Sequence, residues 1–154
     1  MGDIYFYHLT ETPLEATLPQ LLHKALGAGW RIELRGTDAQ RIDFLDKVLW
    51  ERPEDGFLPH GRAGAPHESD QPILLTLGDE AQNNPVCIMS VDGAEIRADE
   101  AKSMERICIL FDGADGDAVA HAREQWRGLT SDGCSAQYWA QEDGRWVKKA
   151  ETAA

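Results

Sequence analysis

Residues 106–139 read RICILFDGADGDAVAHAREQWRGLTSDGCSAQYW and contain a complete strand–helix–strand unit. The run over 106–111 is short and apolar, with a charge before it and Asp-Gly after it, which is typical of a strand covered on both faces of an α/β sheet. A polar stretch separates this strand from a helix that we expect over 118–130. Residues 136–141 then predict the returning strand, so this unit alone indicates an α/β fold.

The helix over 118–130 carries two different surfaces. Asp115 or Asp117 can cap its N-terminus and places negative charge at the positive end of the helix dipole. At about 100° per residue, one apolar stripe forms, made of Val119, Ala122, Trp126 and Leu129. Arg123 and Arg127 lie four residues apart on the adjoining stripe, beside Trp126.

Two interpretations of this helix stay open from the residues alone. Arginine forms bidentate hydrogen bonds with carboxylates, and an aromatic edge can wall a pocket, so Arg123, Trp126 and Arg127 suit an acidic, partly apolar peptide. In the alternative, Trp126 is an ordinary core residue and the arginines are solvated, with Arg127 complementing the C-terminal dipole of the helix.

The rest of the chain alternates between strand and helix patterns. We expect further strands over 4–9, 30–34, 72–77 and 86–91, further helices over 18–28 and 38–50, and an edge segment over 145–149. Residues 96–105 form an acidic connector with room for one helical turn. Strands that alternate with helices indicate parallel strands joined by right-handed crossovers, with helices covering the sheet.

The start of the first helix depends on Pro19. A capping pattern begins at Thr12 and another at Thr17. In a helix that begins at Thr12, Pro19 would lie in the interior and cost about 3 kcal/mol. In a helix that begins at Thr17, Pro19 falls in the first turn. We therefore expect the helix to begin at Leu18.

Residues 51–72 predict a long loop that is rich in proline, glycine and acidic residues. Its one apolar anchor is FLPHG over 57–61. Long loops in compact domains are usually functional or mobile. His60 could serve a site, but the chain offers no second catalytic group at a recognisable spacing, so we interpret it as a structural hydrogen-bonding residue.

Composition bounds the possible functions. The chain has 154 residues, 42% of them hydrophobic, which suits one globular domain over 1–150 with a frayed tail over 151–154. The 15 basic and 27 acidic residues give a net charge of −12. Because such a surface repels phosphate, we expect protein partners and no direct binding to nucleic acid.

No cofactor, metal or membrane signal stands out. Cys87, Cys108 and Cys134 lack any CxxC spacing. Cys87 and Cys108 lie in apolar runs, so we interpret these two as small buried side chains of a cytoplasmic protein. No basic-then-apolar leader opens the chain, and no apolar run approaches the ~20 residues of a membrane span. The isolated histidines suggest no metal set.

Each candidate enzyme motif lacks a residue or a spacing that its chemistry requires. Gly27-x-Gly29 lacks the third glycine of a dinucleotide fingerprint, and the acids over 112–117 have the wrong spacing for a calcium loop. Cys134 and His121 could be drawn as nucleophile and base, but a helix end separates them and no third group is evident.

Several motifs occur in an order that resembles a known family. CILFDG, AREQW followed by Arg127, and Tyr138-Trp139 are similar to the C-terminal half of the chi subunit of bacterial DNA polymerase III. The opening IYFYHL, the run LPQLLHKALGAGWR and Leu49-Trp50 leading to FLPHG resemble its first half. The likeness covers nearly the whole chain.

This resemblance implies a non-catalytic accessory protein of DNA replication. Chi-family proteins have a Rossmann-like three-layer α/β fold with a mixed, mostly parallel sheet, and they bind the acidic C-terminal tail of single-stranded-DNA-binding protein. Many pair with a psi subunit and thereby with the clamp loader. The family's tail-binding basic positions correspond to Arg123 and Arg127, and Trp126 matches an aromatic position. The acidic middle and the extended C-terminus depart from the family pattern.

Two functions from other classes remain as alternatives. A Rossmann-like fold would permit a small nucleotide-binding enzyme that uses the carboxyl ends of its parallel strands. A purely structural assembly domain would need no site at all.

Overall fold

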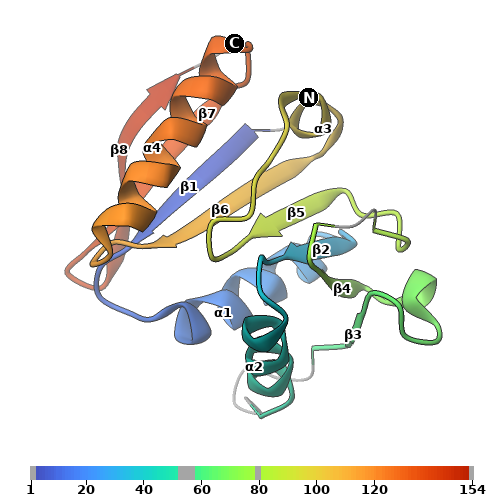
Figure 1. Ribbon diagram of the computed structural model, residues 1–154. Coiled ribbons are helices and arrows are strands. Elements are labelled where there is room, and N and C mark those ends of the chain that lie inside the picture. Colours follow the sequence, from blue (N-terminus) through green and yellow to red (C-terminus); the bar gives the residue numbers. More distant parts are fainter. Residues whose placement is uncertain (1–2, 52–57, 79–80, 153–154) are drawn as a thin grey trace.

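An eight-stranded sheet organises the computed structural model, which describes residues 3–51, 58–78 and 81–152. Within those ranges the strands are β1 (Asp3–Leu9), β2 (Ile32–Arg35), β3 (His60–Arg62), β4 (Ile73–Thr76), β5 (Cys87–Ser90), β6 (Arg106–Asp112), β7 (Ala136–Glu142) and β8 (Arg145–Thr152). Their spatial order is β3-β4-β2-β5-β6-β1-β7-β8. All neighbours are parallel except β7 and β8, so the expected mixed, mostly parallel sheet is confirmed (Figure 1).

Helices cover both faces of this sheet and give the three layers. They are α1 (Leu14–Gly27), α2 (Ala39–Glu51), α3 (Ala98–Ser103) and α4 (Gly116–Ser131), with a short 3-10 turn η2 (Glu68–Asp70). One core cluster joins α1 and α2 to the sheet, and a second joins α3 and α4 to the opposite face. The two clusters confirm the expected α/β sandwich.

β6, which the sequence predicted over 106–111, lies in the middle of the sheet. β6 lies between β5 and β1, and Ile107 to Leu110 are all buried. A strand with parallel neighbours and helices on both sides exposes neither face to water, which is why its sequence is continuously apolar.

The predicted start of the first helix was wrong. α1 begins at Leu14 after an N-cap at Pro13, so Pro19 lies inside the helix. Thr17 is buried and shares a hydrogen bond with the Thr12 hydroxyl at 2.6 Å instead of capping a helix. Pro19 is itself buried within the apolar side of α1, and this burial offsets the main-chain hydrogen bond that proline cannot donate.

The remaining elements follow the sequence more closely. α2 and α4 differ from the predicted ranges by one or two residues at each end, but β3 was missed inside the loop expected over 51–72. Phe57 of the FLPHG anchor lies outside the described residues, whereas Leu58 is fully buried. β8 extends to Thr152, which pairs with Ala136, so it includes the first residues of the tail expected over 151–154.

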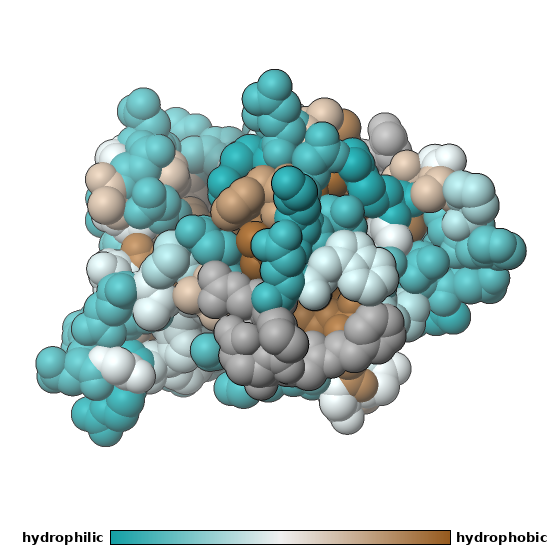
Figure 2. Space-filling view, turned by 90° about the horizontal axis from the view of Figure 1, so that it is seen from below, coloured by the Kyte–Doolittle hydropathy of each residue, from teal (hydrophilic) through white to brown (hydrophobic). Residues whose placement is uncertain are grey.

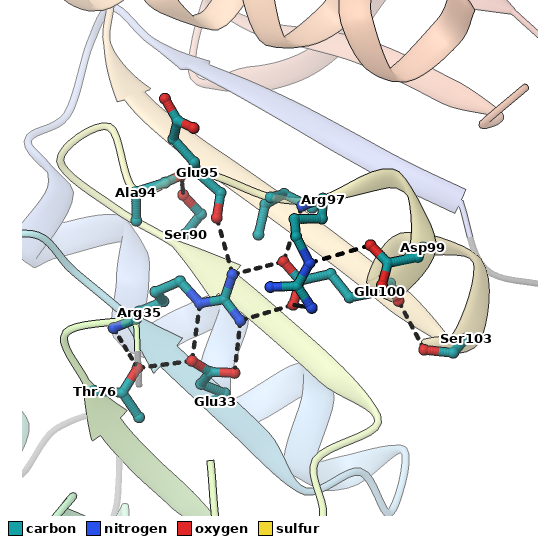
Figure 3. A network of polar contacts seen from close by, with 12 residues as sticks. Glu33, Arg35, Thr76, Ser90, Ala94, Glu95, Arg97, Asp99, Glu100 and Ser103 are labelled. Carbon is teal, nitrogen blue, oxygen red and sulfur yellow. Dashed lines mark hydrogen bonds and ion pairs between the residues drawn. The ribbon is translucent and has the colours of Figure 1, made fainter. Parts of the chain in front are cut away.

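A charged network lies on the face of β2 that is opposite α1 and α2. Residues alternate between the faces of a strand, and Glu33 and Arg35 point away from the face that α1 and α2 cover. Arg35 donates hydrogen bonds to both carboxylate oxygens of Glu33 and of Glu100, which belongs to α3 (Figure 3). Thr76 of β4 donates to Glu33 at 2.7 Å. The network therefore holds α3 to the sheet.

The α2 end of the molecule is mainly hydrophilic. Figure 2 shows this end with hydrophobic atoms in separate patches among mostly hydrophilic ones. Two aromatic side chains of α2 project there: Phe44 is 39% exposed and Trp50 is 60% exposed. The Trp50 ring also lies 4.8 Å from the ring of His60.

Candidate peptide-binding site

α4 has the apolar stripe and the adjoining basic stripe that the sequence predicted. Ala122 and Leu129 are buried against the sheet, whereas Arg123 and Arg127 are exposed. Trp126 lies between them and is partly buried. Asp115 caps the helix by accepting hydrogen bonds from the main-chain N–H groups of Asp117 and Ala118, which settles the choice between the two candidate caps. The helix therefore turns a basic edge outward directly beside an aromatic side chain.

Trp126 forms one wall of an aromatic group. Its ring meets Phe6 of β1 edge-on at 5.3 Å and Tyr138 of β7 edge-on at 6.0 Å. Phe111 at the end of β6 lies 5.9 Å from Tyr138. Edge-to-face contacts at these distances are favourable. Trp126 is therefore both a part of the core and an edge of the exposed surface.

His8 and Tyr138 extend this wall toward the arginines. The Tyr138 hydroxyl and His8 Nδ1 share a hydrogen bond at 2.9 Å. The ring of His8 also lies 5.1 Å from that of Phe111. Strands β1 and β7 are neighbours, so the sheet brings His8 and Tyr138 together from opposite ends of the sequence.

The charge of Arg123 reaches both of these side chains. Burial lowers the pKa of His8 below 6.5, a contact with the Gly113 main chain opposes that change, and Arg123 lowers the pKa further. Burial raises the pKa of Tyr138 above 10, and Arg123 partly offsets the rise. At neutral pH the site therefore combines a neutral imidazole and a neutral phenol with a positive guanidinium group.

Neither arginine of α4 is neutralised. Among the described residues, Arg123 and Arg127 form no ion pair with an acidic side chain. The last turn of α4 contains no basic residue, and Lys102 of α3 donates to the Asp132 carbonyl at 2.6 Å there. Lys102, rather than Arg127, thus supplies the positive charge at the C-terminal end of the helix.

Sequence reasoning named Arg123, Trp126 and Arg127, and missed His8 and Tyr138. The α4 trio follows from helical spacing within one segment. His8 and Tyr138 are 130 residues apart, and only the parallel pairing of β1 with β7 makes them neighbours. The polar His8 within the apolar opening strand was the available signal.

Cys134 and His121 do not form the nucleophile and base that the sequence analysis considered. His121 Nε2 bonds to the Gly93 carbonyl, and Cys134 Sγ lies 4.0 Å from the Ala98 carbonyl. Burial raises the pKa of the Cys134 thiol, which disfavours the reactive thiolate. Cys87 and Cys108 are free and buried, as expected of small core residues, and Cys134 is free and buried as well.

His60 has a structural environment. Its side chain is fully buried, Nδ1 bonds to the Leu58 carbonyl at 2.7 Å, and Nε2 lies 2.9 Å from an oxygen of Asp46. Across the described ranges, no three His, Cys, Asp or Glu side chains gather closely enough to hold a metal ion, and no helix is long and apolar enough to cross a membrane.

A cavity of about 820 Å³ occupies the position where a nucleotide would be expected. It lies at the carboxyl ends of β1 and β6, whose following helices leave on opposite faces of the sheet. Its rim carries six carboxylates and one arginine, Arg41, which is paired with Asp92. Such a rim repels phosphate, so the cavity does not favour the nucleotide-binding alternative.

Comparison with known proteins agrees with the geometry. The family model described as "DNA polymerase III chi subunit, HolC" matches residues 1–137 of this chain. A protein of Rickettsia prowazekii (strain Madrid E) with the name "Probable DNA polymerase III subunit chi" is 29% identical over 119 residues. That alignment covers 73% of this chain and 71% of the relative.

Proposed function

Because this chain belongs to the family of DNA polymerase III chi subunits, we propose that it binds the acidic C-terminal tail of single-stranded-DNA-binding protein. Membership makes it an accessory subunit of a replicative polymerase with protein partners in the holoenzyme. Arg123 and Arg127 pair with the carboxylates of the tail. Trp126, with Tyr138 and His8, walls the place for its final aromatic side chain.

One observation carries this proposal: on a protein of net charge −12, two arginines that form no ion pair within the described part of the chain lie beside a partly buried aromatic wall. Each charge-assisted hydrogen bond from these arginines to a ligand contributes about 1.5 to 3 kcal/mol. An acidic peptide with an aromatic end matches both features.

The finer assignment to the clamp loader, directly or through a psi subunit, rests on family membership alone. It is part of the same proposal, in which the chain connects the coated single strand to the polymerase assembly and performs no catalysis. Co-purification with clamp-loader subunits, with and without a psi subunit, tests this part separately from tail binding.

Tail binding is tested with a fluorescent peptide that ends in acidic residues and phenylalanine. Arg123→Ala is expected to weaken binding about tenfold, which corresponds to about 1.4 kcal/mol, and Arg123→Glu should abolish it. Both should keep the melting temperature of the wild type because the side chain is exposed. Added salt should weaken wild-type binding, since the ion pairs are solvent-exposed.

Lys47→Glu provides the matched control. Lys47 is exposed on α2, away from the aromatic wall, and the substitution changes the net charge by the same two units. Its peptide affinity should stay within about twofold of wild type. If Arg123→Glu binds the peptide as tightly as wild type, the site is wrong, and the structural assembly role becomes the better description of α4.

A further inference from the structure

The flank of α4 opposite Arg123 borders the cavity of about 820 Å³ at the carboxyl ends of β1 and β6. At 100° per residue, Asp117, His121 and Gln125 lie on the other side of the buried ridge from the basic edge. The tail site and this cavity are therefore separate surfaces of one helix. The cavity volume is within the ~300 to 1,000 Å³ that is usual for ligand pockets.

The cavity combines an apolar floor with an acidic rim. Leu9, Ile109 and Ala122 line it and are buried. Its rim carries Glu11, Glu15, Asp92, Asp112, Asp115 and Asp117. The N-terminus of α4 adds only about half a positive charge, and Arg41 adds one. The carboxylates outweigh both, so the cavity favours a cation.

Two of these carboxylates have no partner in the described chain. Asp115 caps α4, Asp112 accepts from the main-chain N–H of Ala114, Glu11 accepts from that of Gly144, and Asp92 pairs with Arg41. Glu15 and Asp117 form no hydrogen bond or ion pair through their side chains among the described residues. They lie in the first turns of α1 and α4 and both line the cavity.

Gln125 also lines the cavity, but its amide adds no accessible donor there. The side-chain oxygen of Gln125 accepts from the main-chain N–H of Ile96 at 3.2 Å, which fixes the orientation of the amide. Its nitrogen is shut off from solvent, so a ligand in the cavity cannot reach it. The ligand is therefore selected by the carboxylates of the rim and by the apolar floor, and together these favour a cation that carries an aliphatic stem.

We propose that this cavity is a second docking site, which takes a basic segment of a partner protein. A lysine or arginine of the segment lays its aliphatic stem on the floor and its charged head between Glu15 and Asp117. An acidic tail is excluded from this cavity by the same carboxylates, so the two sites bind ligands of opposite charge.

The test uses two labelled hexapeptides, one with lysines alternating with leucines and one with glutamates in place of the lysines. Fluorescence anisotropy should show saturable binding of the lysine peptide, and the glutamate peptide should not compete for it. The Glu15→Gln and Asp117→Asn double variant should weaken lysine-peptide binding at least fivefold. Its affinity for the acidic tail peptide should remain at the wild-type value.

Glu51→Gln with Asp70→Asn serves as the matched control, because both residues are exposed and lie outside the cavity. It removes the same two charges and should change lysine-peptide affinity less than twofold. Ala114→Trp, on the exposed loop at the cavity rim, should block the lysine peptide without any change of charge. Undetectable binding to wild type, equal loss in the two charge variants, or unimpaired binding by Ala114→Trp would each overturn the proposal.

Discussion

At position 113 the main chain passes so close to His8 that no side chain fits. A Cβ atom there would lie 2.2 Å from His8 Cδ2 and 2.7 Å from the Leu9 carbonyl oxygen. The N–H of Gly113 also donates to that carbonyl at 2.7 Å. Gly113 therefore sets the position of His8, and through His8 that of the Tyr138 hydroxyl.

Gly113→Ala should lower the free energy of unfolding by about 1 to 3 kcal/mol, because either His8 or the main chain must move. Urea denaturation measures this change. Gly128→Ala is the control: nothing lies within 4 Å of a Cβ at that position inside α4, so alanine should stabilise the protein by up to about 1 kcal/mol. A stable Gly113→Ala protein would show that this packing is looser than described.

The pKa of His8 should respond to an acidic ligand bound at Arg123. Its pKa lies below 6.5 in the free protein because of burial and the nearby charge of Arg123. A bound carboxylate that pairs with Arg123 removes part of this repulsion, so we expect the tail peptide to raise the pKa of His8. A proton NMR titration of the imidazole, with and without peptide, measures the difference.

The shifts in the pKa of His8 determine how stability and peptide affinity change with pH. Folding favours the neutral imidazole, so this contribution to stability is complete above pH 6.5 and decreases as the pH falls toward the folded pKa. Peptide binding favours the protonated imidazole, so affinity should increase over the same fall in pH while the peptide carboxylates stay ionised. An unchanged His8 pKa on saturation with peptide would place the ligand elsewhere.

Among the elements, the attachment of α3 to β2 depends on Arg35. Burial alone would lower the pKa of its guanidinium group, but hydrogen bonds with Glu100 and Glu33 raise it on balance. The pKa of Glu100 is lowered, because its bonds with Arg35 and Arg97 outweigh burial. Glu33 is 2% exposed, so its carboxylate depends on this single cation for neutralisation.

Arg35→Met should destabilise the protein by roughly 3 to 5 kcal/mol, because it leaves a buried carboxylate without a counterion. Adding Glu33→Gln should recover part of the loss. Arg41→Met, which breaks the exposed pair with Asp92, should cost less than about 1 kcal/mol. Chemical denaturation of the three variants checks the ranking. Equal costs at positions 35 and 41 would contradict a buried network.

Local patterns predicted most elements, and the errors have physical causes. α4 was predictable because its N-terminal cap and its apolar stripe agree within one segment. α1 was not, because buried apolar contacts of the helix outweigh the local cost of Pro19. β3 has three residues, and its pairing with β4 cannot be read from a stretch so rich in glycine and charge. His8 and Tyr138 could not be predicted as neighbours of the α4 residues, because that prediction requires the order of the strands in the sheet.

For the whole molecule, charge is the property that decides which partners can bind. The net charge of −12 opposes the phosphate backbone, and the exposed basic edge of α4 is small beside it. We therefore expect no measurable affinity for bare single-stranded DNA at physiological salt. Any location of this protein on DNA must then come through a protein that already coats the strand.

Retention on immobilised single-stranded DNA tests the central claim most directly. The account predicts no retention on bare DNA, retention when full-length single-stranded-DNA-binding protein coats the strand, and loss of retention when that protein lacks its acidic tail. The Arg123→Glu variant should not be retained on any of the three surfaces. Wild-type retention on bare DNA, or on DNA coated with the tail-less protein, would contradict tail binding as the function of this site.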